Sequence, residues 1–352
     1  MPPLAPEDLD HILTHTRDLW PELRGNNLFL TGGTGFVGCW LVESFLWAND
    51  RLGLNASATV LTRDPESFAR KAPHLAGHPA LRLFRNDVRN FEFPDGEFPI
   101  LIHAATEASA SLARLEPLAM LDTIMCGTRR TLEFTRRCGA RKFLLTSSGA
   151  VYGKQPPNLS HVPEDYLGGP DPLNSGSVYG EGKRTAELLC AIYASRYGFE
   201  CKIARCFAFV GPYLPLGIHF AIGNFIRDAM AGEPIRISGD GTPFRSYLYA
   251  ADLAVWLWTI LFRGEPLRPY NVGSENAVSI AELARIVAGA LGPDIEVPAA
   301  QAPLPGASAE RYVPSTDRAR KELRLKQTVD LQAAIRRTAL WYSQCQAEAG
   351  AA

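Results

Sequence analysis

From Asn26 onward, short β-rich apolar runs alternate with longer stretches whose apolar positions recur at helical spacing. The runs that predict strands lie at 28–31, 58–62, 81–85, 100–103, 142–146 and 201–207. The stretches that predict helices lie at 37–47, after Pro65, at 117–138 and at 178–197. Strands that alternate with helices predict βαβ units, and therefore an α/β fold with a doubly wound parallel sheet covered by helices on both faces.

The two ends of the chain depart from this alternation. Apolar residues between positions 4 and 24 have helical spacing, which predicts a packing helix within an N-terminal extension over residues 1–25. After Gly211-Pro212 the pattern changes to helices and short strands broken by Gly and Pro. We therefore expect a main domain over residues 26–210 and a smaller, partly interleaved α/β subdomain over residues 211–345.

The loop after the first predicted strand carries glycines at positions 32, 35 and 38 and runs directly into a helical pattern. Gly32 permits the tight turn, Gly35 lets the backbone approach a pyrophosphate, and Gly38 lets the helix pack on the strand. The free N–H groups at the helix N-terminus then face the phosphates. This pattern predicts a Rossmann-like site for NAD or NADP. The predicted cofactor contacts in this loop are Gly32, Thr34, Gly35, Phe36, Val37 and Gly38.

The ends of the next strands predict the rest of the cofactor site. A carboxylate at the end of the second strand binds the ribose 2′-hydroxyl of NAD, whereas an arginine accepts the 2′-phosphate of NADP. Thr62 stands where that carboxylate is expected, and Arg63 follows it. NADP is therefore slightly favoured over NAD. Further cofactor contacts are expected after the third and fourth strands, from Asp87, Val88, Ala104 and Ala105.

Tyr179 and Lys183 lie four residues apart in a predicted helix, so their side chains reach the same ligand from one helix face. A neighbouring ammonium favours the phenolate, which makes Tyr179 a candidate general base. The strand at 142–146 runs into Ser147-Ser148, so a hydroxyl from this neighbouring strand end can share the substrate oxygen with Tyr179. These residue types predict the oxidation or reduction of a carbinol.

The composition narrows the choice of partners. With 36 basic and 37 acidic residues the formal net charge is -1, so we expect a small-molecule ligand and no nucleic acid. The cysteines include no C-x-x-C pair and the histidines form no ligand set, which predicts reduced, mostly buried thiols and no metal site. His103 closes a core strand and is predicted to be structural. Without a signal-like leader or a long apolar run, we expect a cytoplasmic protein that does not bind membranes.

The order of these motifs resembles the extended short-chain dehydrogenases/reductases, and within them the nucleotide-sugar epimerase/dehydratase family. The resemblance covers about residues 26–325 and is also carried by residues 147–153 and by Gly211-Pro212. It implies a nucleotide-sugar substrate, a catalytic role for Ser148 and a cofactor contact for Lys183. The family commonly dimerises through the helices predicted at 117–138 and 178–197, so a homodimer is expected.

The resemblance also implies ligand contacts outside these motifs. Phe207, the last residue of the sixth predicted strand, is expected to contact the cofactor. Asn224 and Arg245 are expected to face the nucleotide diphosphate, which suits the fork geometry of an arginine. The family carries a further diphosphate-binding arginine near the position of Pro305, where this chain has none, and Arg311 is expected to compensate.

One departure from the family pattern bears directly on the reaction. Members that eliminate water carry Asp-Glu immediately after the catalytic hydroxyl, and decarboxylating members keep the Glu, whereas this chain has Gly149-Ala150. Chemistry that needs only Ser, Tyr, Lys and the nicotinamide fits this site better. We therefore expect a nucleotide-sugar 4-epimerase that works through a transient 4-keto intermediate.

Other functions stay open. An NADPH-dependent reductase of 4-keto-6-deoxy nucleotide sugars would use the same residues in half the cycle, and Arg63 favours it. A dehydratase or decarboxylase would need a carboxylate from elsewhere, for which Glu107 and Glu164 are candidates. An NAD(P)-sensing module without catalysis is a further alternative, but such a module does not need Ser148, Tyr179 and Lys183 together.

Overall fold

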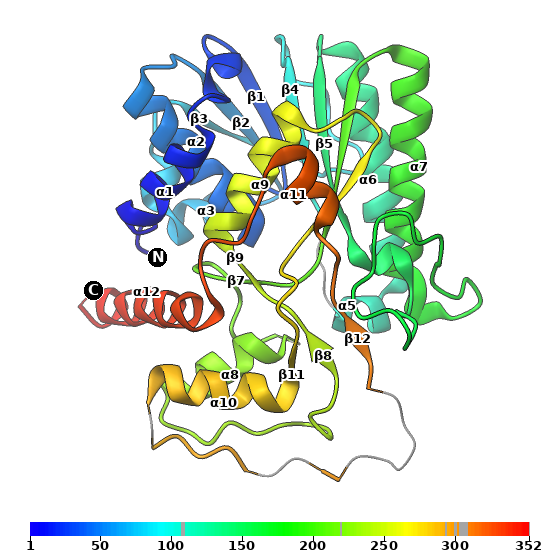
Figure 1. Cartoon of the computed structure of the whole chain (residues 1–352). Helices are drawn as coiled ribbons and strands as arrows, with labels where there is room; N and C mark the ends of the chain where they lie inside the picture. The colour runs from blue at the N-terminus through cyan, green and yellow to red at the C-terminus, as the bar shows by residue number, and fades with distance from the viewer. Residues whose placement is uncertain (107–109, 219, 293, 299–300, 303–308, 352) are drawn as a thin grey trace.

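A computed structural model of the chain describes all residues except 107–109, 219, 293, 299–300, 303–308 and 352. Within the described residues, a seven-stranded parallel sheet has the strand order β10-β6-β5-β4-β1-β2-β3 (Figure 1). The predicted Rossmann-like α/β fold is confirmed. The strands are β1 (Asn27–Thr31), β2 (Ser57–Thr62), β3 (Leu81–Arg85), β4 (Ile100–His103), β5 (Lys142–Ser148), β6 (Glu200–Cys206) and β10 (Pro269–Val272).

Each face of the sheet is covered by its own set of helices, because successive strand residues point to opposite faces. Leu28 and Leu30 of β1 belong to the larger core, together with residues of α2 (Phe36–Leu52) and α9 (Ala250–Arg263). Phe29 belongs to the second core, with residues of α6 (Pro117–Arg137) and α7 (Val178–Tyr197). Burial on both faces explains why this strand is a continuous apolar run.

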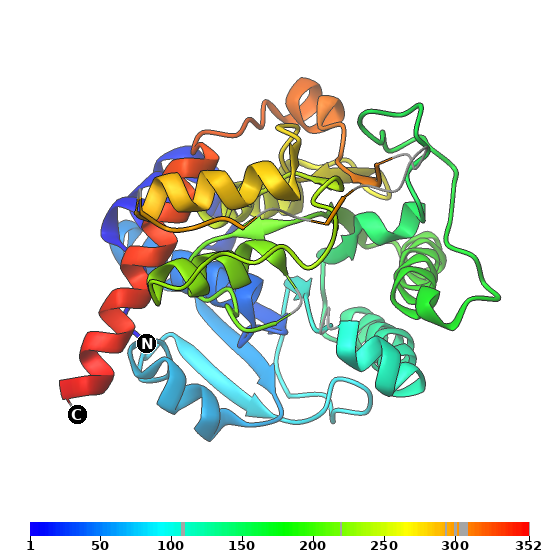
Figure 2. The same cartoon turned by 90° about the horizontal axis from the view of Figure 1, so that it is seen from below.

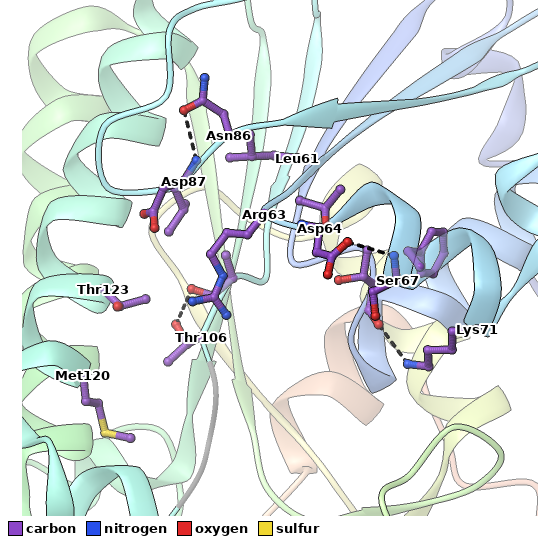
Figure 3. A pocket seen from close by; sticks show the side chains of 15 residues that line it. Leu61, Arg63, Asp64, Ser67, Lys71, Asn86, Asp87, Thr106, Met120 and Thr123 are labelled. Carbon is purple, nitrogen blue, oxygen red and sulfur yellow. Dashed lines mark hydrogen bonds between the residues drawn. The ribbon is translucent and has the colours of Figure 1, made fainter.

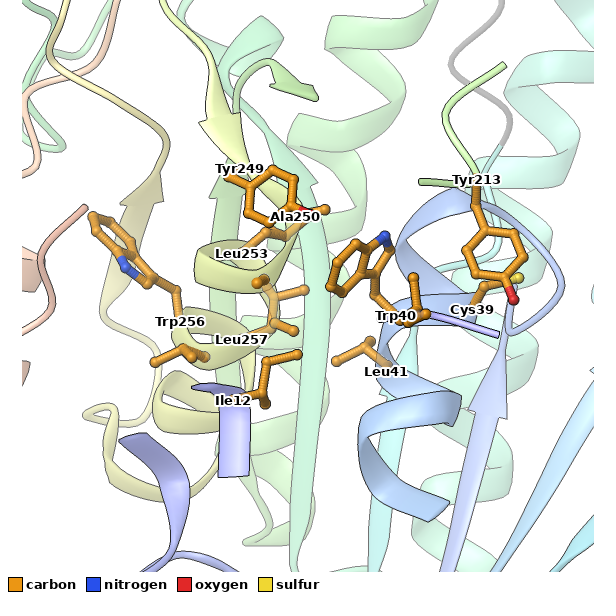
Figure 4. Close-up of a cluster of buried hydrophobic side chains, with 14 of the residues drawn as sticks. Ile12, Cys39, Trp40, Leu41, Tyr213, Tyr249, Ala250, Leu253, Trp256 and Leu257 are labelled. Carbon is orange, nitrogen blue, oxygen red and sulfur yellow. The ribbon is translucent and has the colours of Figure 1, made fainter. Parts of the chain in front are cut away.

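Helix α9 lies at the centre of the larger core. Its residues from Ala250 to Phe262 are all buried, and Leu253 and Leu257 pack near Trp40 of α2 and Ile12 of the N-terminal extension (Figure 4). A mostly apolar helix that is buried on every side is typical of the core of a large domain. No helix in the described part of the chain is long and apolar enough to cross a membrane.

The predicted N-terminal helix is present as α1 (Pro6–Thr16), followed by the short 3-10 helix η1 (Trp20–Leu23). Asp8 of α1 is buried, and its carboxylate accepts hydrogen bonds from the Tyr249 hydroxyl at 2.5 Å and from Arg337 at 2.6 Å. Tyr249 precedes α9 and Arg337 lies in α12 (Leu331–Ala351), so one carboxylate ties the start of the chain to its last helix.

Helices α8 and α10 and strands β8, β11 and β12 lie beyond the carboxyl ends of the central strands, below the sheet in Figure 1 and towards the viewer in Figure 2. Two small sheets pair β7 with β9 and arrange β11, β8 and β12 in that order. Between β9 and β11 the chain returns to the main sheet through α9 and β10. Bounds of the other elements are α3 (Pro65–Lys71), α4 (Pro73–Ala76), α5 (Ala110–Leu115), η2 (Gly149–Tyr152), η3 (Ser175–Ser177), β7 (Phe209–Val210), α8 (Ala221–Met230), β8 (Phe244–Arg245), β9 (Leu248–Tyr249), β11 (Val278–Ser279), α10 (Ile280–Leu291), β12 (Arg311–Tyr312) and α11 (Asp317–Leu323).

The Asp8 contacts give a first prediction. Asp8→Ala leaves the Tyr249 hydroxyl and the Arg337 guanidinium without their shared acceptor, so the free energy of unfolding should fall by about 1–3 kcal/mol. Urea denaturation followed by circular dichroism measures this change. Glu7→Ala, which removes an exposed carboxylate from the same helix, is the control and should leave the unfolding midpoint unchanged. Equal effects of the two substitutions would contradict the proposed tie.

Candidate active site

The glycine loop between β1 and α2 is packed so closely that Gly32 and Gly38 meet backbone atoms where a side chain would begin, and Gly33 meets the Val60 side chain. A Cβ on Gly32, whose φ is +75°, would lie 2.4 Å from the Ala104 carbonyl carbon, and a Cβ on Gly38 would lie 2.2 Å from the Gly32 oxygen. A Cβ on Gly35 would meet only the Gly32 oxygen, at 3.5 Å. Gly35 is the N-cap of α2 and offers no side-chain cap, so the helix N–H groups are free to bind an anion. This cradle fits the diphosphate of a dinucleotide.

A cavity of about 340 Å³ lies next to this loop at the ends of β2, β3 and β4 (Figure 3). Its size falls within the range of small-molecule sites. The predicted cofactor residues Phe36 and Val37 instead pack partly against the larger core. Predicted cofactor residues that line the cavity are Thr34, Arg63, Asp87, Val88 and Ala105, and Thr62, Asp64, Ser67, Lys71, Thr106 and Met120 line it as well.

The charged groups of this cavity differ in how they are held. The exposed Arg63 side chain extends into the cavity (Figure 3) and forms no ion pair with a described residue. The Asp87 carboxylate, in contrast, forms an ion pair with Arg89 at 2.9 Å, and this contact lowers the pKa of Asp87. Lys71 donates to the carbonyl oxygen of Thr34 at 3.0 Å and thereby ties α3 to the glycine loop. The Arg63 guanidinium is therefore available to a ligand in this cavity. Lys71 also lines the cavity, and the sequence pattern did not predict it.

Lys183 is anchored beneath the site. Its ammonium donates to the Thr146 carbonyl at 2.8 Å and to the Thr106 hydroxyl at 3.2 Å, and only 3% of the residue is exposed. Burial disfavours the charged form and lowers the pKa of Lys183 to about 8. Since Thr106 also lines the cofactor cavity, it connects this cavity to Lys183. The ammonium lies 5.9 Å from the centre of the Tyr179 ring.

Ser148 and Tyr179 meet at the end of β5. The Ser148 hydroxyl accepts a hydrogen bond from the Ala150 N–H at 3.1 Å. Burial raises the pKa of Tyr179 to about 12, and the neighbouring Ser148 hydroxyl opposes this shift. The structure therefore brings together the three residues that the sequence analysis proposed as catalytic. The one difference in the local prediction is that β5 continues through Ser148 and does not end at Thr146.

Tyr312 is a second phenol near the same serine, and the sequence pattern did not predict it. It lies in β12, and Ser148 opposes the rise in pKa that burial gives its phenol. Its ring packs on Phe207 with the ring centres 4.7 Å apart. The Phe207 ring also covers Gly149, since a Cβ there would come within 2.6 Å of it. Phe207, a predicted cofactor contact, thus lies between Tyr312 and the residue after Ser148.

The residues predicted to bind the substrate diphosphate are not gathered at one point. The Asn224 side chain in α8 accepts from Arg227 at 3.2 Å, and the Arg311 guanidinium lies 4.2 Å from the centre of the Phe244 ring. Arg245 is opposite Tyr312 in the β8–β12 ladder, and its charge opposes the rise in the pKa of Tyr312. Of these residues, Arg245 is therefore the one that lies beside Tyr312.

Glu164, a candidate for the carboxylate that a dehydratase or decarboxylase would need, is held by structural partners. Glu164 is 8% exposed, and its carboxylate accepts from the Asn271 N–H at 2.9 Å and lies 3.9 Å from Arg318. The Glu164 carboxylate forms no hydrogen bond or ion pair with Ser148, Tyr179 or Lys183, so the structure does not favour it as a catalytic carboxylate. Glu107 lies outside the described residues.

His103 is buried at the end of β4. Burial lowers its pKa to about 3, so the ring is neutral, and it shares hydrogen bonds with Thr31 at 2.7 Å and Thr128 at 3.0 Å. These contacts agree with the structural role predicted for His103. Four of the free cysteines are buried, and the described residues contain no cluster of metal-ligating side chains.

A Rossmann-like sheet with a glycine cradle and a clustered Ser, Tyr and Lys defines an extended short-chain dehydrogenase/reductase. The model of the family described as the NAD dependent epimerase/dehydratase family matches residues 28–273. UDP-glucuronic acid decarboxylase 3 of Arabidopsis thaliana is 32% identical over 302 residues, which cover 84% of this chain and 81% of that relative. The chain therefore belongs to the NAD dependent epimerase/dehydratase family, as its motifs predicted.

Solved structures share the fold. The UDP-glucose 4-epimerase of Thermotoga maritima, solved with UDP-glucose, has a TM-score of 0.75 and 22% identity, and the match covers 91% of this chain and 99% of that one. The Bordetella bronchiseptica enzyme WbmF, solved in complex with NADH, has a TM-score of 0.76 and 22% identity, and the match covers 93% and 95% of the two chains. At these identities the likeness establishes the architecture alone.

The geometry of the glycine loop separates two effects of adding a methyl group. Gly38→Ala forces a contact of 2.2 Å with the loop backbone and should lower the free energy of unfolding by about 1–3 kcal/mol. Gly35→Ala meets no such obstacle, so the unfolding midpoint should stay unchanged while dinucleotide binding weakens. Thermal unfolding and calorimetric titration with NAD⁺ and NADP⁺ measure the two quantities. The assignment of Gly35 to the diphosphate fails if Gly35→Ala binds both dinucleotides as the wild type does.

Proposed function

We propose that this chain is a nucleotide-sugar 4-epimerase that uses NAD or NADP. The observation that carries the proposal is the cluster of Ser148, Tyr179 and Lys183 beside Gly149 and Ala150, where the residues needed for elimination or decarboxylation are absent. Inversion at C4 needs one base, one hydrogen-bond donor to the sugar oxygen and a hydride carrier, which this site can supply.

The proposed roles follow from the contacts. Tyr179 takes the proton from the sugar O4, and Ser148 donates a hydrogen bond to that oxygen. Lys183 binds the ribose of the cofactor and lowers the pKa of Tyr179 by its charge. A bound nicotinamide dinucleotide would supply the hydride acceptor and donor. The 4-keto sugar turns within the pocket, after which Tyr179 returns the proton and the other C4 epimer forms.

The similarity to UDP-glucuronic acid decarboxylases favours UDP-linked sugars, and UDP-glucuronic acid is the first substrate to test. It also makes decarboxylation the second candidate function. Oxidation of this sugar at C4 yields a β-keto acid, whose carboxylate is lost as CO2 when a proton donor serves C5. Ala150 supplies no such donor, and the Phe207 ring fills the space beside Gly149. Both features support return of the hydride over loss of CO2.

For the cofactor, we propose a preference for NADP. Arg63 extends into the cofactor cavity without an ion-pair partner among the described residues, and Thr62 offers no carboxylate to the ribose. A 2′-phosphate there would pair with the guanidinium. Asp64 does not compete for this position, because its carboxylate accepts from the Ser67 N–H at 2.8 Å and caps α3.

We also propose a homodimer formed through α6 and α7. These neighbouring helices expose Leu118 at 76%, Leu188 at 60% and Ile192 at 48%, which is more apolar surface than a solvent-facing pair of helices needs. In a symmetric dimer the same surface of each subunit would cover the other.

The proposed reaction predicts a specific product. Incubation with UDP-glucuronic acid and NAD⁺ or NADP⁺ should invert C4 without release of CO2, as followed by proton NMR and capture of labelled carbon dioxide. Tyr179→Phe should reduce turnover by about 10²–10⁴-fold. Release of CO2 in place of a C4 epimer would establish the decarboxylase instead. If no UDP sugar is converted and a 4-keto-6-deoxy sugar is reduced with consumption of NADPH, the chain is a reductase.

The cofactor preference has its own test. Arg63→Ala should weaken NADP⁺ binding by about 10-fold or more, while NAD⁺ binding changes by less than about twofold, because one charge-assisted bond to the 2′-phosphate is lost. Calorimetric titration with the two dinucleotides measures both constants. Arg89→Ala is the control, since Arg89 is already paired with Asp87. Equal losses for the two dinucleotides would contradict a 2′-phosphate contact.

A further inference from the structure

We propose that Thr106 is a positioning residue for Lys183: its hydroxyl holds the ammonium at the edge of the cofactor cavity, where an N–H of the ammonium can reach a bound dinucleotide. The inference rests on the proposed role of Lys183 as a cofactor contact. It goes further, because it assigns the placement of that lysine to a residue that belongs to none of the sequence motifs.

The Lys183 ammonium has three N–H groups to donate, and only 3% of the residue is exposed. One N–H donates to the Thr146 carbonyl at 2.8 Å and a second donates to the Thr106 hydroxyl at 3.2 Å. The third N–H has no hydrogen-bond acceptor among the described residues. A buried charge needs hydrogen-bond partners to offset the loss of water, so this N–H is free to bind a polar group of a ligand.

The Thr106 hydroxyl is oriented to accept from Lys183. Its own proton is donated to the Ala105 carbonyl at 2.8 Å, which leaves the lone pairs of the oxygen for the ammonium. The backbone is fixed as well, since the Thr106 N–H donates to the Ala104 carbonyl at 3.0 Å and the Ala104 N–H donates to the Thr31 carbonyl of β1 at 3.0 Å. The acceptor is therefore held in place by the protein itself.

The two acceptors that hold the ammonium come from neighbouring strand ends. Thr146 lies in β5 and Thr106 follows β4, and these strands pair in the main sheet. With the Thr146 bond alone, the long side chain of Lys183 could still turn about that bond. The second bond draws the ammonium towards the cofactor cavity, which Thr106 lines (Figure 3). Because a lysine loses conformational entropy when it becomes ordered, an ammonium that is already ordered binds a ligand more tightly.

Thr106→Val tests the proposal, because it removes the acceptor and keeps the shape of the side chain. The dissociation constants for NAD⁺ and NADP⁺ should both rise by about tenfold, since a hydrogen bond to a charged group is lost and both dinucleotides share the ribose that Lys183 is proposed to bind. Calorimetric titration measures both constants. Thr106→Ser, which restores the hydroxyl, should bind both dinucleotides within about twofold of the wild type. Thr135→Val is the matched control, since the buried Thr135 hydroxyl donates to the Thr131 carbonyl of its own helix at 2.8 Å, and its dissociation constants should equal those of the wild type.

A double-mutant cycle separates positioning of Lys183 from a direct contact between Thr106 and the cofactor. Once Lys183→Met has removed the ammonium, adding Thr106→Val should change the dissociation constants by less than about twofold. An effect of Thr106→Val that persists in the Lys183→Met background overturns the proposal, as does wild-type binding by Thr106→Val or a failure of Thr106→Ser to restore binding. None of these titrations needs a sugar, so the expected pattern in a protein that converts no UDP sugar supports the role of Thr106 and refutes only the 4-epimerase reaction.

Discussion

The parallel direction of the central strands is the constraint on which the whole site depends. Because β1, β2, β3, β4, β5 and β6 all run the same way, their carboxyl ends meet at one edge of the sheet. The glycine loop, Arg63, Asp87 and Ser148 are far apart in sequence, yet each lies at or just after such an end. The close approach of Gly32 to the Ala104 backbone shows how tightly neighbouring ends are packed. A side chain at the end of any of these strands therefore lies at the same edge of the sheet as the others.

The proposed catalytic groups Lys183 and Tyr179 are both buried, which disfavours their charged forms. Burial lowers the pKa of Lys183 and raises that of Tyr179, so in the protein alone each group is pushed towards its neutral form. A base at Tyr179 therefore needs help from nearby charge and from hydrogen bonds. The Ser148 hydroxyl opposes the rise in the pKa of Tyr179, and in the proposed mechanism the charge of Lys183 adds to this effect. The positive nicotinamide ring of an oxidised cofactor would add to it, which links deprotonation of the sugar to the presence of the hydride acceptor.

Much of the fold could be predicted because its signals are local. Strands buried on both faces are continuous apolar runs, and the helix at 178–197 has its observed bounds, α7 (Val178–Tyr197). The glycine loop and the spacing of Tyr179 and Lys183 are local signals as well. Tyr312 could not be found in this way, because β12 has two residues and its position depends on pairing with β8, far away in the sequence. Lys71 was missed for a similar reason, since its partner is a backbone carbonyl that has no sequence signal.

Gly149 and Ala150, after Ser148, depart from the acidic residues that the family resemblance implies for members that eliminate water or CO2, and the packing fits this departure. With Gly149 in place, the Phe207 ring can lie over the backbone and pack on Tyr312. An aspartate at position 149 would need the space that this ring occupies. A carboxylate beside Ser148 would also repel a phenolate on Tyr179. Without an acidic side chain at either position, the proposed site is suited to moving one proton to and from a single sugar oxygen.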